Sequence, residues 1–510
     1  MIFSRWFTFI LGIWIGMSGC LPMAEAFTPT AQAAPTVIPT STTVIPTATE
    51  ILPSATATAG LDAEPGASGV GDSLYPLLGN GGYDVQHYTL DLMVNDVLEG
   101  ELEGTTTIEA RATQDLSTFN LDFIRFDIQR ILVNGENTEF RQTQHELIVQ
   151  PSAPLEENEP FTVEVQYRGS PVTERGAGFR VGWFTFEEGS FVFSEPNGAA
   201  TFFPVNDHPL DKASYTFRVT VPKPYEVAAN GVLAQAVEQG ESTTFVFEAR
   251  DPMASYLATI SIDEFDLETS QSEKGVPIRN YYPTGAPENV NDPFERQGEM
   301  IDYFSEVFGA YPFEVYGAIV IDTEIGAALE TQTLSIFGRE IADPTISEVA
   351  EGVVAHELAH QWFGNSVSLG DWRDIWLNES FATYAQALWV EYKEGPDALD
   401  AWIRELYAFV SENLEQMSPP GEPPANALFN PGVYEWGALA LHALRLEVGD
   451  EVFFDVLKTY HERFAGGNAR TEDFIAVAEE VSGQELSAFF ESWLYSEELA
   501  PIPEMGLEAN

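Results

Sequence analysis

The sequence predicts a multidomain α+β protein in which an antiparallel β domain precedes a domain of helices and a small sheet. Two periodicities indicate this order. Between about residues 80 and 270, apolar and polar residues alternate with period two, and Gly, Pro, Asn and Asp separate the runs, which is typical of short antiparallel strands. From about residue 290 the period becomes helical, apart from the alternating stretch 316–337. With 510 residues, of which 44% are hydrophobic, the chain is long enough to bury several cores.

Residues 1–20 have the pattern of an export signal. Arg5 precedes a 12-residue apolar run at 6–17, which is shorter than the roughly 20 residues that span a bilayer. The run leads into Met-Ser-Gly-Cys at 17–20, which resembles a bacterial lipobox. We therefore expect a lipoprotein-type signal peptide, lipidation of Cys20, and an exported protein anchored to a membrane. An ordinary signal peptide or an uncleaved anchor is the alternative.

Residues 21–75 are predicted to be a disordered stalk, because they are rich in Thr, Pro and Ala and cannot form a core. The net charge of the chain is −57, from 23 basic and 80 acidic residues. This charge argues against a nucleic-acid partner, whose phosphates need basic surface. The simplest interpretation of the acidic composition is that it keeps the protein soluble. The alternative is an electrostatic field that attracts cationic substrates.

We place the β domain at residues 76–270 and the catalytic domain at 271–510. Within the second domain the alternating stretch 316–337 predicts strands of a small sheet. The remaining periodic segments predict helices at 294–308, 346–365, 379–392, 398–413, 434–448, 451–464, 471–481 and 485–495.

A metal-binding motif lies in one of these helices. The sequence His-Glu-Leu-Ala-His at 356–360 has the form H-E-x-x-H, and four residues are 1.1 helical turns, so His356 and His360 project from one face. Both imidazoles can then bind one Zn²⁺. Glu357 leaves the helix about 100° away, beside the metal, where it can take a proton from a water.

A third ligand is needed, because catalytic zinc sites have three protein ligands and one place for water. Eighteen residues follow the motif before Glu379, and Gly364, Asn365, Gly370 and Asp371 allow the chain to turn. A second helix running back past the first would offer Glu379 to the metal in its first turn. The sequence therefore predicts one zinc ion per chain, bound by His356, His360 and Glu379.

The motif, its spacing to Glu379 within Trp-Leu-Asn-Glu, and the continuation His-Gln-Trp-Phe-Gly-Asn at 360–365 resemble the aminopeptidase N family of gluzincin zinc aminopeptidases. The resemblance extends over roughly residues 80–505. It implies a thermolysin-like fold for the catalytic domain. About 75 residues follow Tyr434, so the long C-terminal helical domain of many relatives is not expected.

The resemblance also implies roles for three further residues. The family signature G-A-M-E-N corresponds to Ala-Ala-Leu-Glu-Thr at 327–331, which assigns the grip on the substrate's α-ammonium to Glu330. Nine residues before Pro204 of the F-P-x-x-D-x-P motif, Glu195 is the second acid of that grip. Tyr434, in Tyr-Glu-Trp-Gly, corresponds to the tyrosine that donates a hydrogen bond to the oxyanion.

The resulting hypothesis is a zinc aminopeptidase that acts on peptides with a free N-terminus. A carboxylate that binds the α-ammonium at a fixed distance from the metal places the first peptide bond at the metal, which is the arrangement of an exopeptidase. A non-catalytic surface binding protein on the same fold, an endopeptidase with an open cleft, and a hydrolase of non-peptide molecules are the alternatives. The remaining histidines (His87, His145, His208, His442 and His461) are interpreted as structural.

Overall fold

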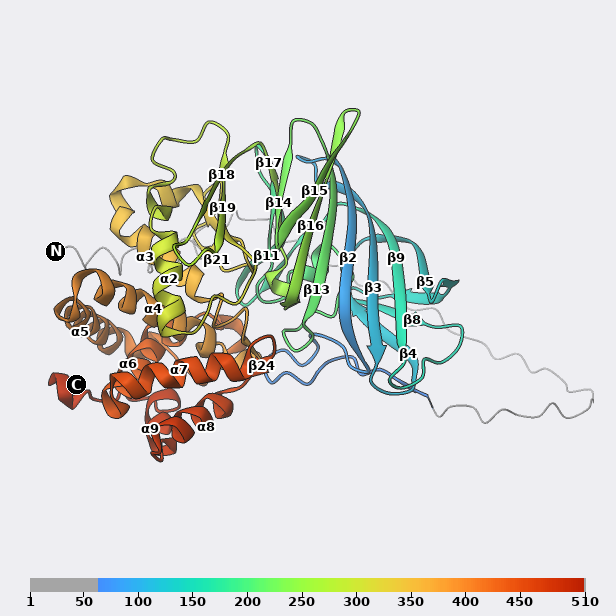
Figure 1. Cartoon of the computed structure of the whole chain (residues 1–510). Helices are drawn as coiled ribbons and strands as arrows, with labels where there is room; N and C mark the ends of the chain where they lie inside the picture. The colour runs from blue at the N-terminus through green and yellow to red at the C-terminus, as the bar shows by residue number, and fades with distance from the viewer. Residues whose placement is uncertain (1–62, 509–510) are drawn as a thin grey trace, which may run out of the picture.

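The computed structural model describes residues 63–508, which form two domains packed side by side (Figure 1). The predicted signal peptide, Cys20 and most of the predicted stalk lie outside the described residues. In the part of the chain that the structure describes, no helix has both the length and the apolar character needed to cross a membrane.

An eight-stranded sheet forms the body of the β domain, and its burial alternates as the sequence predicts. In β2, for example, every second side chain over most of the strand is buried. Neighbouring strands are antiparallel except for β2 and β13, which run parallel. The strand order is β15 (Val232–Gln239), β16 (Ser242–Met253), β13 (Ala213–Pro222), β2 (Tyr83–Asp96), β3 (Glu101–Ala112), β9 (Pro160–Gly169), β5 (Asp127–Val133) and β6 (Glu136–Asn137).

Two smaller sheets complete the β domain. The four-stranded sheet has the order β1 (Glu64–Pro65), β4 (Leu116–Asp122), β8 (Glu146–Gln150) and β7 (Glu139–Gln142). The five-stranded sheet has the order β10 (Thr173–Gly176), β11 (Phe179–Thr185), β12 (Ser190–Phe193), β17 (Ile260–Asp263) and β14 (Glu226–Ala229). Glu195, a predicted site residue, lies two residues after the end of β12.

A mixed five-stranded sheet opens the catalytic domain. Its order is β18 (Phe265–Gln271), β19 (Pro277–Pro283), β20 (Tyr316–Ile321), β22 (Ser335–Gly338) and β21 (Ala328–Leu329). The predicted domain boundary at residue 271 is therefore slightly late, because β18 already pairs with β19, and β19 pairs in parallel with β20. Period-two alternation continues across the boundary, so it could not show where one sheet ends and the next begins.

Helices pack beside this sheet and fill one side of the molecule in Figure 1. They are α2 (Gln297–Val307), α3 (Ser347–Ala359), α4 (Trp376–Glu394), α5 (Pro396–Asn413), α6 (Gly437–Val448), α7 (Asp450–Phe464), α8 (Thr471–Ser482) and α9 (Ser487–Leu494). The zinc-motif helix α3 ends earlier than predicted, because residues 360–367 form tight turns in which the Asn365 amide donates to the His360 carbonyl and Gly364 has φ 127°.

The predicted stalk ends earlier than residue 75, because residues 63–75 are packed on the body. The fully buried carboxylate of Asp72 accepts hydrogen bonds from His208 Nε2 of the β domain at 3.1 Å and from the Trp372 amide of the catalytic domain at 2.7 Å. Ser73 in turn donates its amide and its hydroxyl to Asp371. This segment therefore ties the two domains together just before α4.

Replacing Asp72 with Ala should lower the free energy of unfolding by about 3 kcal/mol, because four donors would lose a buried acceptor. Burial alone would raise the pKa of Asp72, but the hydrogen bonds from His208 and the backbone amides hold it below its ordinary value. Its stabilisation is then complete above about pH 4 and is lost as the pH falls through the folded-state pKa.

Urea unfolding of the wild-type protein and of Asp72→Ala between pH 3 and pH 8 measures this difference. The exposed Glu64→Ala is the control. A difference that grows as the pH falls would contradict the assignment of an ionised, hydrogen-bonded Asp72.

Candidate metal centre

A cavity of about 310 Å³ lies between the two domains. The β domain contributes Phe179 and Phe193 to its wall, and the catalytic domain contributes residues of α3, α4 and the segment before α6. All seven site residues that the sequence singled out line this one cavity: Glu195, Glu330, His356, Glu357, His360, Glu379 and Tyr434.

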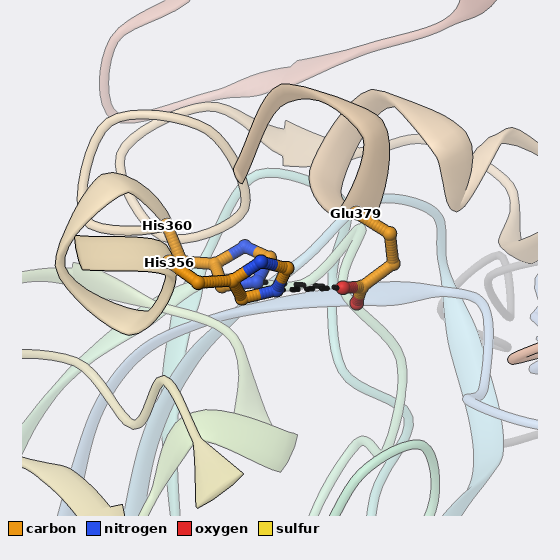
Figure 2. A group of neighbouring side chains, drawn as sticks. All are labelled: His356, His360 and Glu379. Atoms are coloured by element: carbon orange, nitrogen blue, oxygen red, sulfur yellow. Dashed lines mark hydrogen bonds and ion pairs between the residues drawn. The ribbon is translucent and has the colours of Figure 1, made fainter. Parts of the chain in front are cut away.

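Two imidazoles and one carboxylate point toward one another, as Figure 2 shows, and all three line the cavity. Nε2 of His356 lies 3.3 Å from Oε2 of Glu379, and Nε2 of His360 lies 3.5 Å from the same oxygen. Ligands placed about 2.0–2.1 Å from a tetrahedral zinc ion are separated by about 3.3 Å from one another. The carboxylate oxygen therefore lies at about this spacing from each imidazole nitrogen, and all three ligand atoms lie within 4.8 Å of one another.

The local sequence explains this geometry. His356 lies in the last turn of α3, and His360, one turn further on, is the C-terminal cap of this helix. Glu379 lies in the first turn of α4, which packs against α3. Nδ1 of His360 lies 3.0 Å from the Phe363 carbonyl oxygen, so this nitrogen carries the proton and Nε2 is left for the metal. Gln386 hydrogen-bonds to the His356 side chain and orients the second imidazole.

Buried carboxyl groups crowd around the two imidazoles. Burial first, and then repulsion from neighbouring carboxylates, raise the pKa values of Glu195 and Glu357, and the pKa of Glu330 rises to about 7. Burial opposes ionisation of Glu379, but the imidazoles lower its pKa to about 2. Burial would lower the pKa of His360, yet the facing carboxylates raise it to about 10. The field in the cavity is therefore strongly negative and favours cations.

Glu357 lies beside the ligand set and not in it. It belongs to a second group of close side chains, with Glu330 and His360, that contains only one imidazole. The group of His356, His360 and Glu379 is the one whose two imidazoles and one carboxylate match a catalytic zinc site. Glu357 thus lies close to His360 but outside the group of two imidazoles and one carboxylate.

Glu195 and Glu330 reach the cavity from different domains. Glu195 follows β12 of the β domain, and Glu330 follows β21 of the catalytic domain. Within the described residues, the Oε1 atoms of both carboxylates are buried and lack a hydrogen-bond partner. Two buried acceptor oxygens without a donor can bind a cationic group, because such a group supplies both positive charge and N–H donors.

Tyr434 lies in a single π-helical turn, η9 (Gly432–Trp436), directly before α6. Its ring stacks on the ring of His356, with the centroids 6.1 Å apart. Burial raises the pKa of Tyr434, so its hydroxyl stays protonated and can donate a hydrogen bond. The prediction of an ordinary helix start missed this irregular turn.

Sequence reasoning also missed several residues of the site. Gln386 had a detectable signal, because it lies seven residues after Glu379 and so projects from the same face of α4. The aromatic residues of the cavity wall had no such sequence signal. Phe179, Phe193 and Phe429 come from three separate segments and meet only through the tertiary fold.

Two family models match the chain. The peptidase M1 N-terminal domain matches residues 84–257, and the peptidase family M1 domain matches residues 293–493. A crystal structure of an M1 zinc metallopeptidase variant from Deinococcus radiodurans, bound to a Tyr-Ser-Ala substrate, is 34% identical, with a TM-score of 0.79. The alignment covers 85% of this chain and 99% of that one.

Curated relatives are longer. Aminopeptidase N of Streptomyces lividans is 29% identical over 56% of this chain and 36% of its own length. Human glutamyl aminopeptidase is 30% identical over 59% of this chain and 33% of its own length. The aligned part of the chain thus spans about a third of these relatives.

The fold and the site are those of a two-domain zinc metallopeptidase. The chain belongs to peptidase family M1.

Replacing Glu379 with Gln removes a charged ligand, so it should weaken zinc binding by more than about a hundredfold. Loss of a residue that only hydrogen-bonds to a ligand costs about tenfold to a hundredfold. Metal analysis after dialysis against graded chelator measures this change. Glu357→Gln is the matched control, since it removes a neighbouring buried carboxylate that is not a ligand. It should keep zinc and lose turnover. Equal zinc loss in both variants would contradict the ligand assignment.

Proposed function

We propose that this protein is a zinc aminopeptidase that removes the first residue of peptides. The proposal rests on two buried carboxylates beside the metal ligands, Glu195 and Glu330, whose Oε1 atoms both lack a hydrogen-bond partner. An α-ammonium group has three N–H donors and one positive charge, so it fits this pair. With the amine held there, the first peptide bond would lie next to a zinc ion bound by His356, His360 and Glu379.

Each residue has one task in this proposal. Zinc on His356, His360 and Glu379 would polarise the scissile carbonyl and lower the pKa of a water. Glu357 accepts the proton of the attacking water and returns it to the leaving amine. Tyr434 donates a hydrogen bond to the carbonyl oxygen as negative charge develops on it.

The cavity also suggests which first residues are accepted. Its lining contains five carboxyl groups and no Lys or Arg, and its apolar wall is formed by Phe179, Phe193, Phe429 and Leu329. An acidic side chain would be repelled and would find no cationic partner. We infer a preference for apolar or basic first residues, unlike the glutamate that the names of several relatives indicate.

The central test compares an alanyl anilide with its N-acetylated form at pH 7. Acetylation removes the charge and two donors, so kcat/KM should fall at least a hundredfold, as expected when buried charged partners are left unpaired. A glutamyl anilide should also be cleaved at least tenfold more slowly than the alanyl compound.

Equal cleavage of the alanyl compound and its acetylated form would favour an endopeptidase. Cleavage of neither by protein with zinc bound would favour a binding protein or a hydrolase of other molecules.

We further propose that the protein is exported and anchored by a lipid at Cys20. The apolar run at 6–17 and the lipobox-like Met-Ser-Gly-Cys support this. Mass spectrometry of the mature N-terminus should show a chain that begins at lipidated Cys20. An unmodified Cys20, or a cleavage at another site, would contradict the anchor.

A further inference from the structure

The main chain at Glu330 is held by two side-chain amides that follow the zinc motif. Nε2 of Gln361 donates to the Glu330 carbonyl oxygen at 3.0 Å, and Nδ2 of Asn365 donates to the same oxygen at 2.7 Å. Both side chains are fully buried. Gln361 is the residue directly after the ligand His360, so the hydrogen bonds join the metal site to the peptide that carries the amine-binding carboxylate.

Gln361 also binds the far end of the same turn. Its Oε1 accepts a hydrogen bond from the Thr333 amide at 2.9 Å. Thr333 has φ 67°, which is strained for a β-branched residue and is maintained only when the surroundings enforce it. The turn at 330–333 therefore depends on partners outside itself for its shape.

The β domain also contacts this turn. Nδ2 of Asn230 donates to the Gln332 carbonyl at 2.7 Å, and the Gly231 amide donates to Oγ1 of Thr333 at 2.8 Å. Nζ of the half-buried Lys212 donates to the carbonyls of Asn365 at 2.8 Å and Ser366 at 3.0 Å, which fixes the loop that presents the Asn365 side chain.

We propose that Gln361 and Asn365 are positioning residues that set the distance between the metal ligands and Glu330, and thereby the cut after the first residue. The proposal rests on the proposed aminopeptidase function. The distance matters because misplacing a reacting group by about 1 Å can cost a hundredfold in rate. Without these amides the carboxylate of Glu330 would keep its charge. It would no longer hold the substrate's α-ammonium at the distance from the metal ligands that selects the first peptide bond.

The test uses the full-length zinc-loaded protein and two variants, Gln361→Met and Asn365→Ala. Each should raise KM for the alanyl anilide and reduce the preference for the free amine over its acetylated form, by about tenfold to a hundredfold. Zinc content should stay at the wild-type value. In Gln361→Met the hydrogen exchange of the Thr333 amide should also accelerate, because its acceptor is gone.

Gln297→Met is the matched control. Gln297 is equally buried, and its Oε1 accepts a hydrogen bond from Nδ2 of Asn280, but it lies on α2, outside the cavity lining. This variant should lower stability without changing the preference. If wild-type preference persists in Gln361→Met and Asn365→Ala, or if the control loses it equally, the positioning role is wrong. Failure of the proposed function would instead appear in the wild-type protein, as equal cleavage of both substrates, and would overturn both proposals.

Discussion

The site depends on one geometric constraint, which is that three ligand atoms from two helices meet at spacings of 3.3 and 3.5 Å. That convergence places Glu195, Glu330, Glu357 and Glu379 in one buried cavity. Burying so many carboxyl groups together is costly unless cations compensate them. The metal would compensate one part of this charge, and the substrate ammonium the other. In the proposed function, the same negative field therefore serves both zinc binding and selection of a free amine.

The β domain takes a direct part in the site. It supplies Glu195 from the end of β12, and it supports the Glu330 turn through Asn230 and Gly231. The segment around Asp72 ties it to the start of α4, where Glu379 lies three residues into the helix. A shift between the domains would change the separation of Glu195 and Glu330. The interdomain contacts are thus part of what the proposed amine site requires.

The sequence was sufficient where the signal is local. Period two predicted the strands, and the 1.1-turn spacing of His356 and His360 predicted two side chains on one helix face. Resemblance to a family placed Glu195, Glu330 and Tyr434 in the site, and the structure brings these residues together. Contacts between distant segments left no local signal: Asp72 binds residues 136 and 300 positions away, so composition alone assigned it to a stalk. The strained turn at Thr333 was equally hidden, since threonine rarely adopts a positive φ.

A titration of zinc into the chelator-treated full-length protein tests whether one metal ion at these three ligands supports cleavage. Bound metal and cleavage of an alanyl anilide would be measured at each step. Cleavage should rise in proportion to bound zinc and reach its plateau at one zinc per chain. Full cleavage without metal, or a plateau that requires two zinc ions, would contradict this expectation.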